Sequence, residues 1–115
     1  MSINLHTAVA YKIEISDILI YGVDSKEALY DLFQEFEITH NADDEFDNEY
    51  DVNRSELQRF RNDVANHTKY FRSRAKFFAE KLEIIKLTEK QFILFLDRLI
   101  NESDQDNEQV LLAWF

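Results

Sequence analysis

The chain opens with a stretch in which hydrophobic and polar positions alternate. From Leu5 to Ile15 every second residue is β-branched, leucine or tyrosine, and the positions between them are small or polar. A period of two with this composition predicts a β-strand over residues 5–15. The stretch from Phe46 to Val52 alternates in a similar way and predicts a second, shorter strand, with residues 38–45 as the loop before it.

Helical spacing, in which apolar residues recur every three or four positions, predicts three helices. The first covers residues 25–36, with Asp24 as its N-cap and Glu27 at the reciprocal position of a capping box. The second runs from 54 to 82 without glycine or proline, so we expect one long helix of about eight turns. The third begins after Thr88, which has capping-box spacing to the glutamine three residues on.

The end of the chain combines a turn with an apolar run. Residues 103–107 are turn formers, and we expect Val110–Phe115 to return as a strand beside the first one, because an exposed tail of this composition would aggregate. The chain is thus predicted to be an α+β protein with a single domain over residues 1–115. Its small antiparallel sheet would contain the N-terminal, middle and C-terminal strands, packed against one long and two shorter helices.

Composition narrows the classes of protein to consider. The 115 residues include one glycine, no proline and no cysteine. Glycine-rich phosphate loops, disulfides and thiolate metal sites are therefore excluded. The N-terminal residues lack the basic and apolar regions of a signal peptide, and charges interrupt each apolar cluster, so we expect a cytoplasmic protein without a membrane span.

Charge is segregated along the chain, whose formal net charge is −10. Residues 1–53 hold 13 acids and 2 bases, whereas residues 54–81 hold 3 acids and 8 bases. Residues 82–115 are acidic again, with 7 acids and 3 bases. A field of this kind steers an anionic protein toward cationic partners.

Two strings at the ends of the chain carry a resemblance. LHTAVAYKIE near the start and VLLAWF at the end resemble the ends of small uncharacterised acidic proteins of bacterial phages and conjugative elements. The resemblance implies an accessory role on a mobile element. It covers these two strings alone and carries no active-site residue across.

Six carboxylates crowd into nine residues in the middle of the chain. They are Asp43, Asp44, Glu45, Asp47, Glu49 and Asp51. A calcium loop of the EF-hand type needs a central glycine and a distal glutamate at a spacing that is not present here. Two interpretations stay open: the segment is an ordinary solvated edge, or it copies the charge of a nucleic-acid backbone and occupies a partner's basic groove.

The second interpretation has a geometric basis. Alternate residues of a strand lie about 6.6–6.8 Å apart on one face, which is close to the phosphate spacing along a single DNA strand. Asp47, Glu49 and Asp51 alternate in this way. A second alternating set near the chain end, interrupted by turn residues, comprises Glu102, Asp104, Asp106 and Glu108.

Five basic residues of the predicted long helix would project within about 80° of one another. They are Arg54, Arg61, Lys69, Arg72 and Lys76. Contacts from such a stripe to phosphates make direct nucleic-acid binding the alternative function. Equally open is a stripe that faces the protein's own acids, those of a second copy, or a partner protein.

Tyr70 and Phe77 fall on the side of this helix away from its apolar stripe, among Arg59, Arg74 and Lys81. Exposed aromatic residues ringed by basic side chains are typical of protein interfaces, so both are candidate partner-binding residues. The alternative is that another helix covers them.

No catalytic constellation stands out, because the three histidines are scattered and no Ser-His-acid set can be assembled. We therefore expect no enzymatic activity and predict no metal or cofactor. The leading hypothesis is a non-enzymatic inhibitor or modulator that binds a basic surface of a host protein, such as a nuclease or its guide-RNA complex, in the manner of anti-CRISPR or anti-restriction proteins. A structural or oligomerising role, including a homodimer, is the second alternative.

Overall fold

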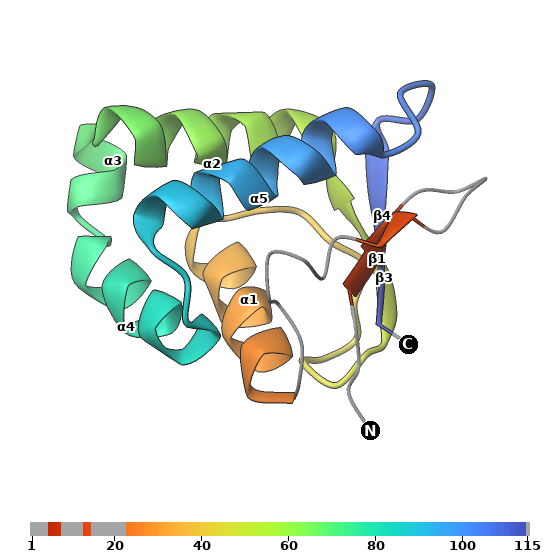
Figure 1. The fold of residues 1–115 in the computed structure, drawn as a ribbon, viewed down its shortest axis with the longest axis horizontal. Helices are drawn as coiled ribbons and strands as arrows, with labels where there is room; N and C mark the ends of the chain where they lie inside the picture. Colours follow the sequence, from red (N-terminus) through yellow and green to blue (C-terminus); the bar gives the residue numbers. More distant parts are fainter. Residues whose placement is uncertain (1–4, 8–12, 15–22, 115) are drawn as a thin grey trace.

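The computed structural model describes residues 5–7, 13–14 and 23–114 (Figure 1). The elements follow in the order β1 (Leu5–Thr7), β2 (Ile13–Glu14), α1 (Val23–Glu35), β3 (Glu49–Asn53), α2 (Arg54–Asn66), α3 (Lys69–Arg72), α4 (Ala75–Ile85), α5 (Glu89–Glu102) and β4 (Gln109–Trp114). Helices packed against an antiparallel sheet confirm the predicted α+β class. In Figure 1, α2 and α5 run side by side, α4 lies beside α1, and the sheet stands at one end of the helices.

The sheet is antiparallel, with the order β2-β1-β4-β3. β4 forms from the C-terminal apolar run, as predicted, and pairs with β3 from Glu49↔Ala113 to Asn53↔Gln109. On its other side β4 pairs with β1. Along β4 the buried and half-buried positions alternate, which places one face of the strand against the helices.

The single strand predicted over residues 5–15 is wrong. β1 and β2 are two short strands that pair with each other in the antiparallel sense, with Thr7 opposite Ile13. A period of two does not distinguish one long strand from two paired ones, and no glycine or proline marks a reversal in this stretch. The remaining positions of the predicted strand lie outside the described residues.

The boundaries of two further elements differ from the predicted ones. β3 begins at Glu49, so Phe46 is not part of the strand and is 61% exposed. α1 begins at Val23, so Asp24 lies in the first helical turn and is not the N-cap. In contrast, Thr88 caps α5 with the full capping box that its spacing predicts.

The long helix predicted over 54–82 is wrong, because the chain bends twice within it. α2 ends at His67, which has the left-handed φ of 47°. Thr68 then caps α3 by accepting a hydrogen bond from Phe71 N–H. The apolar spacing continues through both bends because α2 packs against α5 while α4 packs against α1. One stripe in the sequence thus serves two different faces of the core.

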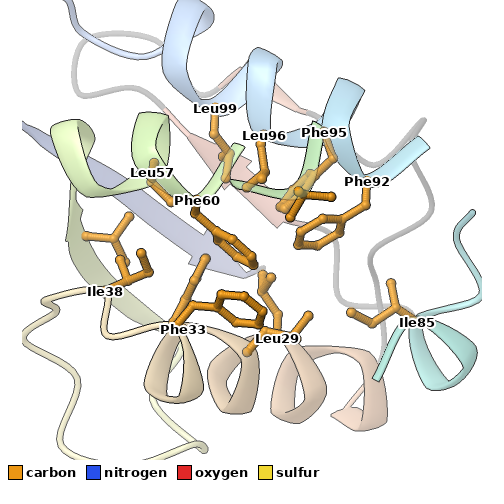
Figure 2. Close-up of a cluster of buried hydrophobic side chains, with 14 of the residues drawn as sticks. Leu29, Phe33, Ile38, Leu57, Phe60, Ile85, Phe92, Phe95, Leu96 and Leu99 are labelled. Atoms are coloured by element: carbon orange, nitrogen blue, oxygen red, sulfur yellow. The ribbon is translucent and has the colours of Figure 1, made fainter. Parts of the chain in front are cut away.

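Aromatic rings fill the space between the helices. Phe36 and Phe60 stack with their ring centroids 4.4 Å apart, and Phe78 and Phe92 lie edge-on to Phe60 at 6.3 and 5.6 Å. Figure 2 shows labelled side chains of α1, α2 and α5 pointing toward one another in this cluster. The core therefore joins the two pairs of helices into one body.

A buried arginine joins the start of α2 to the end of α5. The Arg54 guanidinium donates hydrogen bonds to the carbonyl oxygens of Ile100, Asp104 and Asn107, and the last two contacts are 2.6 and 3.0 Å long. The last carbonyl groups of a helix have no N–H donor within the helix, and the Arg54 guanidinium donates the missing hydrogen bonds. The same side chain fixes the turn that leads into β4.

Candidate partner-binding site

The six carboxylates predicted as a site lie on one continuous stretch between α1 and β3, which we call the acidic segment (residues 43–51). Four of them lie in the loop drawn in yellow in Figure 1, and Glu49 and Asp51 lie in β3. Because Tyr50 and Val52 are buried, the alternation of the strand turns Glu49 and Asp51 to the outer face. Asp47 precedes the strand, so the predicted ladder of three acids is realised by these two residues alone.

The base of the acidic segment is closed by backbone and side-chain contacts. Asn41 N–H donates to Asp51 O at 3.3 Å, and Asp51 N–H donates to Asn41 Oδ1 at 2.7 Å. One step further along, Asn53 N–H donates to Thr39 O at 3.1 Å. These contacts hold the two ends of the loop side by side.

Within the loop, carboxylates bind the backbone. Asp44 Oδ1 accepts a hydrogen bond from Phe46 N–H at 2.8 Å, and its carbonyl accepts one from Asp47 N–H at 3.2 Å. Asp47 Oδ2 accepts from Asp43 N–H. Asp44 and Asp47 thus shape the loop, while Glu45, Glu49 and Asp51 leave their carboxylates outside this set of bonds.

Lys26 of α1 anchors the loop of the acidic segment through hydrogen bonds. Its Nζ donates to Phe46 O at 2.6 Å and to Asn48 Oδ1 at 2.7 Å, and the residue is 6% exposed. Burial lowers the pKa of Lys26, and the carboxylates of Asp47 and Asp44 oppose that shift. The lysine was not a predicted site residue, although it is one of two bases among the first 53 residues and lies in a strongly acidic half of the chain.

Aromatic rings back the acidic segment on its inner side. The Tyr50 ring lies 5.4 Å from that of Trp114 and 5.8 Å from that of His40, and the Lys26 amine lies 5.8 Å from the Trp114 ring. Burial raises the pKa of Tyr50 and lowers that of His40. The backbone N–H of Trp114 also donates to Asn48 O at 2.8 Å, so β4 supports the loop directly.

Phe46 is the residue of this site that the sequence pattern concealed. Alternation with Tyr50 and Val52 suggested an inward strand position, but the ring is 61% exposed and flanked in sequence by acids on both sides. An exposed aromatic ring among carboxylates provides an apolar contact in the middle of an anionic surface.

Substituting Lys26 with methionine tests whether the lysine anchors the loop. Two hydrogen bonds from a buried amine would be lost, and we expect the free energy of unfolding to fall by about 1–3 kcal/mol. Amide hydrogen exchange should accelerate most at residues 43–48. Lys76→Met, at an exposed lysine of α4, is the matched control and should leave both quantities unchanged. Equal exchange rates at residues 43–48 in both variants would contradict the anchoring role.

The contacts of Tyr70 and Phe77 are with residues outside the acidic segment. Tyr70 Oη donates to Glu37 Oε1 at 2.8 Å, and the Arg74 guanidinium lies 3.8 Å from its ring. Burial, together with the bond to Glu37, raises the pKa of Tyr70. Phe77 is half-buried against the core, with the Lys81 amine 5.2 Å from its ring. The structure therefore places both rings in an internal network between α1, α3 and α4.

The five predicted basic residues do not form a stripe, because the helix that would align them is broken. Arg54 is buried and binds carbonyl groups at the end of α5, and Arg61 pairs with Asp97 at 2.9 Å. Arg72 donates to His67 O at 2.8 Å. Lys69 and Lys76 are exposed on α3 and α4 respectively.

The second acidic set is at the opposite end of the β3–β4 pair from the acidic segment. Glu102 pairs with Arg98 within α5, and Glu108 accepts hydrogen bonds from Ser55 Oγ and Ser55 N–H. The bonds from Ser55 lower the pKa of Glu108. A helix end and a turn occupy this region, so the alternation in sequence does not produce a ladder.

Residues 5–7, 13–14 and 23–114 bring together no group of three or more His, Cys, Asp or Glu side chains that could hold a metal ion. Across the same residues, every helix is too short or too polar for a membrane crossing.

Comparison of this chain with protein-family models, with curated proteins and with solved structures gives no match.

Proposed function

We propose that this chain is a non-enzymatic binding protein whose acidic segment engages a basic surface of a partner protein. The observation that carries the proposal is that defined contacts hold the loop of the acidic segment. The loop that carries the carboxylates is held by Lys26 and by bonds at its base, and Phe46 is exposed in the middle of it. Pre-organised charge loses little conformational entropy on binding, which favours a role in recognition.

The partner class follows from charge and from the ends of the chain. A surface that attracts anionic carboxylates is also one that binds phosphates, so the acidic segment would compete with nucleic acid for a basic groove. The resemblance of both chain ends to proteins of mobile elements favours a host nuclease or its guide-RNA complex as the target. In this proposal the N-terminal, middle and C-terminal strands form the rigid support from which the acidic segment is presented.

The proposal predicts an effect of charge reversal that depends on position. Glu45→Lys/Glu49→Lys/Asp51→Lys spares the carboxylates that shape the loop. Once a partner has been captured from the native host and purified, we expect this triple variant to bind it at least about tenfold more slowly at low salt, with a flatter salt dependence. The association rate is measured at salt concentrations from 50 to 300 mM. This range includes the concentrations at which the Debye length is about 8–10 Å.

A control variant separates position from net charge. Glu80→Lys/Glu83→Lys/Asp106→Lys makes the same change of charge at exposed sites outside the acidic segment. It should slow association much less, and it should still displace nucleic acid from the partner. If both triple variants slow association equally, the acidic segment contributes only to the general field, and the proposal fails.

A further inference from the structure

A groove runs between α2 and α5, on a part of the surface that the proposed function does not use. It has a volume of about 420 Å³, and its apolar lining consists of Ala65, Ile93 and Leu94. Leu94 is 52% exposed and is one of three exposed large apolar side chains among the described residues. Leu94 of α5 and Ala65 of α2 line the same open depression from its two sides.

The walls of the groove are fixed by contacts between the two helices. Arg61 of α2 pairs with Asp97 of α5 at 2.9 Å, and His67 Nε2 lies 2.5 Å from Glu89 Oε1. These two contacts join the two sides of the groove.

Charge distinguishes this face from the rest of the molecule. The charged side chains that line the groove are Arg61, Lys90, Glu89 and Asp97, with His67 beside them. Two bases balance two acids, whereas the whole chain carries −10. Like-charge repulsion between two copies is thus small at this face compared with the acidic half of the chain.

The exposed stripe of α5 is complementary to itself when reversed. If a second copy of α5 lies antiparallel across the first, with the two-fold axis between Ile93 and Leu94, then Ile93 of one copy faces Leu94 of the other. In the same register Lys90 of each copy faces Asp97 of the other. On each helix these two residues lie about two helical turns apart. Both pairs arise twice by symmetry, as an isologous interface requires.

We propose that this chain forms a two-fold symmetric homodimer through the groove between α2 and α5. Leu94 of each copy enters the hollow beside Ala65 of the other, and Lys90 of each copy joins the Arg61–Asp97 pair of the other. The occupant is a second copy, because the same four positions of α5 supply both members of the apolar pair and both members of the charged pair.

The first test removes the apolar contact. Sedimentation equilibrium of the wild type should show a mass that rises with concentration toward twice the 13.8 kDa of one chain. Leu94→Asp should weaken the dimer by roughly a hundredfold, since it buries a charge at the centre of the interface. Ile84→Asp, at a 44% exposed isoleucine on α4, is the matched control and should dimerise like the wild type.

The second test reads the register. Lys90→Asp places acids opposite each other across the two-fold axis, and Asp97→Lys places bases opposite each other, so each variant alone should be monomeric. Mixed in equal amounts, the two variants should form a heterodimer, because both charge pairs are then restored with one sign exchanged between copies. Native mass spectrometry distinguishes the heterodimer from either homodimer.

Three results would overturn the proposal. They are a wild type that stays at the monomer mass up to millimolar concentration, an equal effect of Leu94→Asp and Ile84→Asp, and a mixture of the charge variants that remains monomeric. Circular dichroism of each variant establishes whether it is folded. If Asp97→Lys does not fold, Lys90→Asp, which alters a side chain on the surface, still tests the proposal by its own loss of the dimer.

Discussion

Replacing Arg54 with methionine is expected to lower the free energy of unfolding by about 3–5 kcal/mol, a large part of the total stability of a domain of this size. Methionine matches the length of the aliphatic stem but donates no hydrogen bond. The carbonyl oxygens of Ile100, Asp104 and Asn107 would lose the guanidinium that binds them in a site where Arg54 is almost fully buried. Ile100 O keeps a hydrogen bond from Gln105 Nε2, and Asp104 O keeps one from Asn107 N–H, so the expected loss is that of the hydrogen bonds from the charged guanidinium, about 1.5–3 kcal/mol each.

Chemical denaturation measures this loss. Arg72→Met is the matched control, since Arg72 is exposed and donates to one carbonyl oxygen, that of His67, and its substitution should cost less than about 1 kcal/mol. Arg54→Lys should recover only part of the stability, because a single amine does not span three carbonyl groups. Equal losses for Arg54→Met and Arg72→Met would show that the contacts at the end of α5 contribute nothing beyond those of a surface arginine.

Phe60→Ala is expected to have a similar effect, about 3–5 kcal/mol, through a different mechanism. Phe60 is fully buried and contacts the rings of Phe36, Phe78 and Phe92, so its removal leaves a cavity where α1, α2, α4 and α5 meet. These rings are themselves held by the helices, and the cavity should collapse only in part. The cost therefore includes lost dispersion contacts as well as lost burial.

Two other phenylalanines provide a graded control for this prediction. Phe77 is half-buried at the edge of the core, and Phe46 is exposed. We expect the free energy of unfolding to fall most for Phe60→Ala, less for Phe77→Ala, and hardly at all for Phe46→Ala. Thermal unfolding of the three variants tests the order, and a Phe77→Ala loss as large as that of Phe60→Ala would contradict the central place of Phe60 in the core.

The sequence predicted those parts of the fold that depend on neighbouring residues. The α5 cap is an example, because Thr88 and its partner lie three residues apart. The bends after α2 and α3 are not predicted, because the apolar spacing is the same on both sides of them. Thr68 caps α3 through Phe71 N–H three residues on, but Phe71 cannot complete a capping box as Gln91 does, so the sequence signal is weaker. Periodicity reports which residues are buried, and not which partner buries them.

The same distinction applies to the candidate site. The acids of residues 43–51 are adjacent in sequence, so their clustering was visible without a structure. Lys26 reaches the loop from about 20 residues away, and no local pattern indicates such a contact. Phe46 was assigned to the strand because alternation continued by chance across a turn that Asp44 forms with its own side chain. Both residues became evident only from tertiary contacts.

The position of β4 between β1 and β3 has a consequence for the order of folding during synthesis. β4 leaves the ribosome after α1 to α5, so β3 waits without its main partner while the helical core can already assemble. Until then Asn48 also lacks the hydrogen bond from Trp114 that supports the loop. Nascent chains that stop before β4 would carry the acidic segment without its complete frame, and the loop would reach its final support only when β4 pairs with β3.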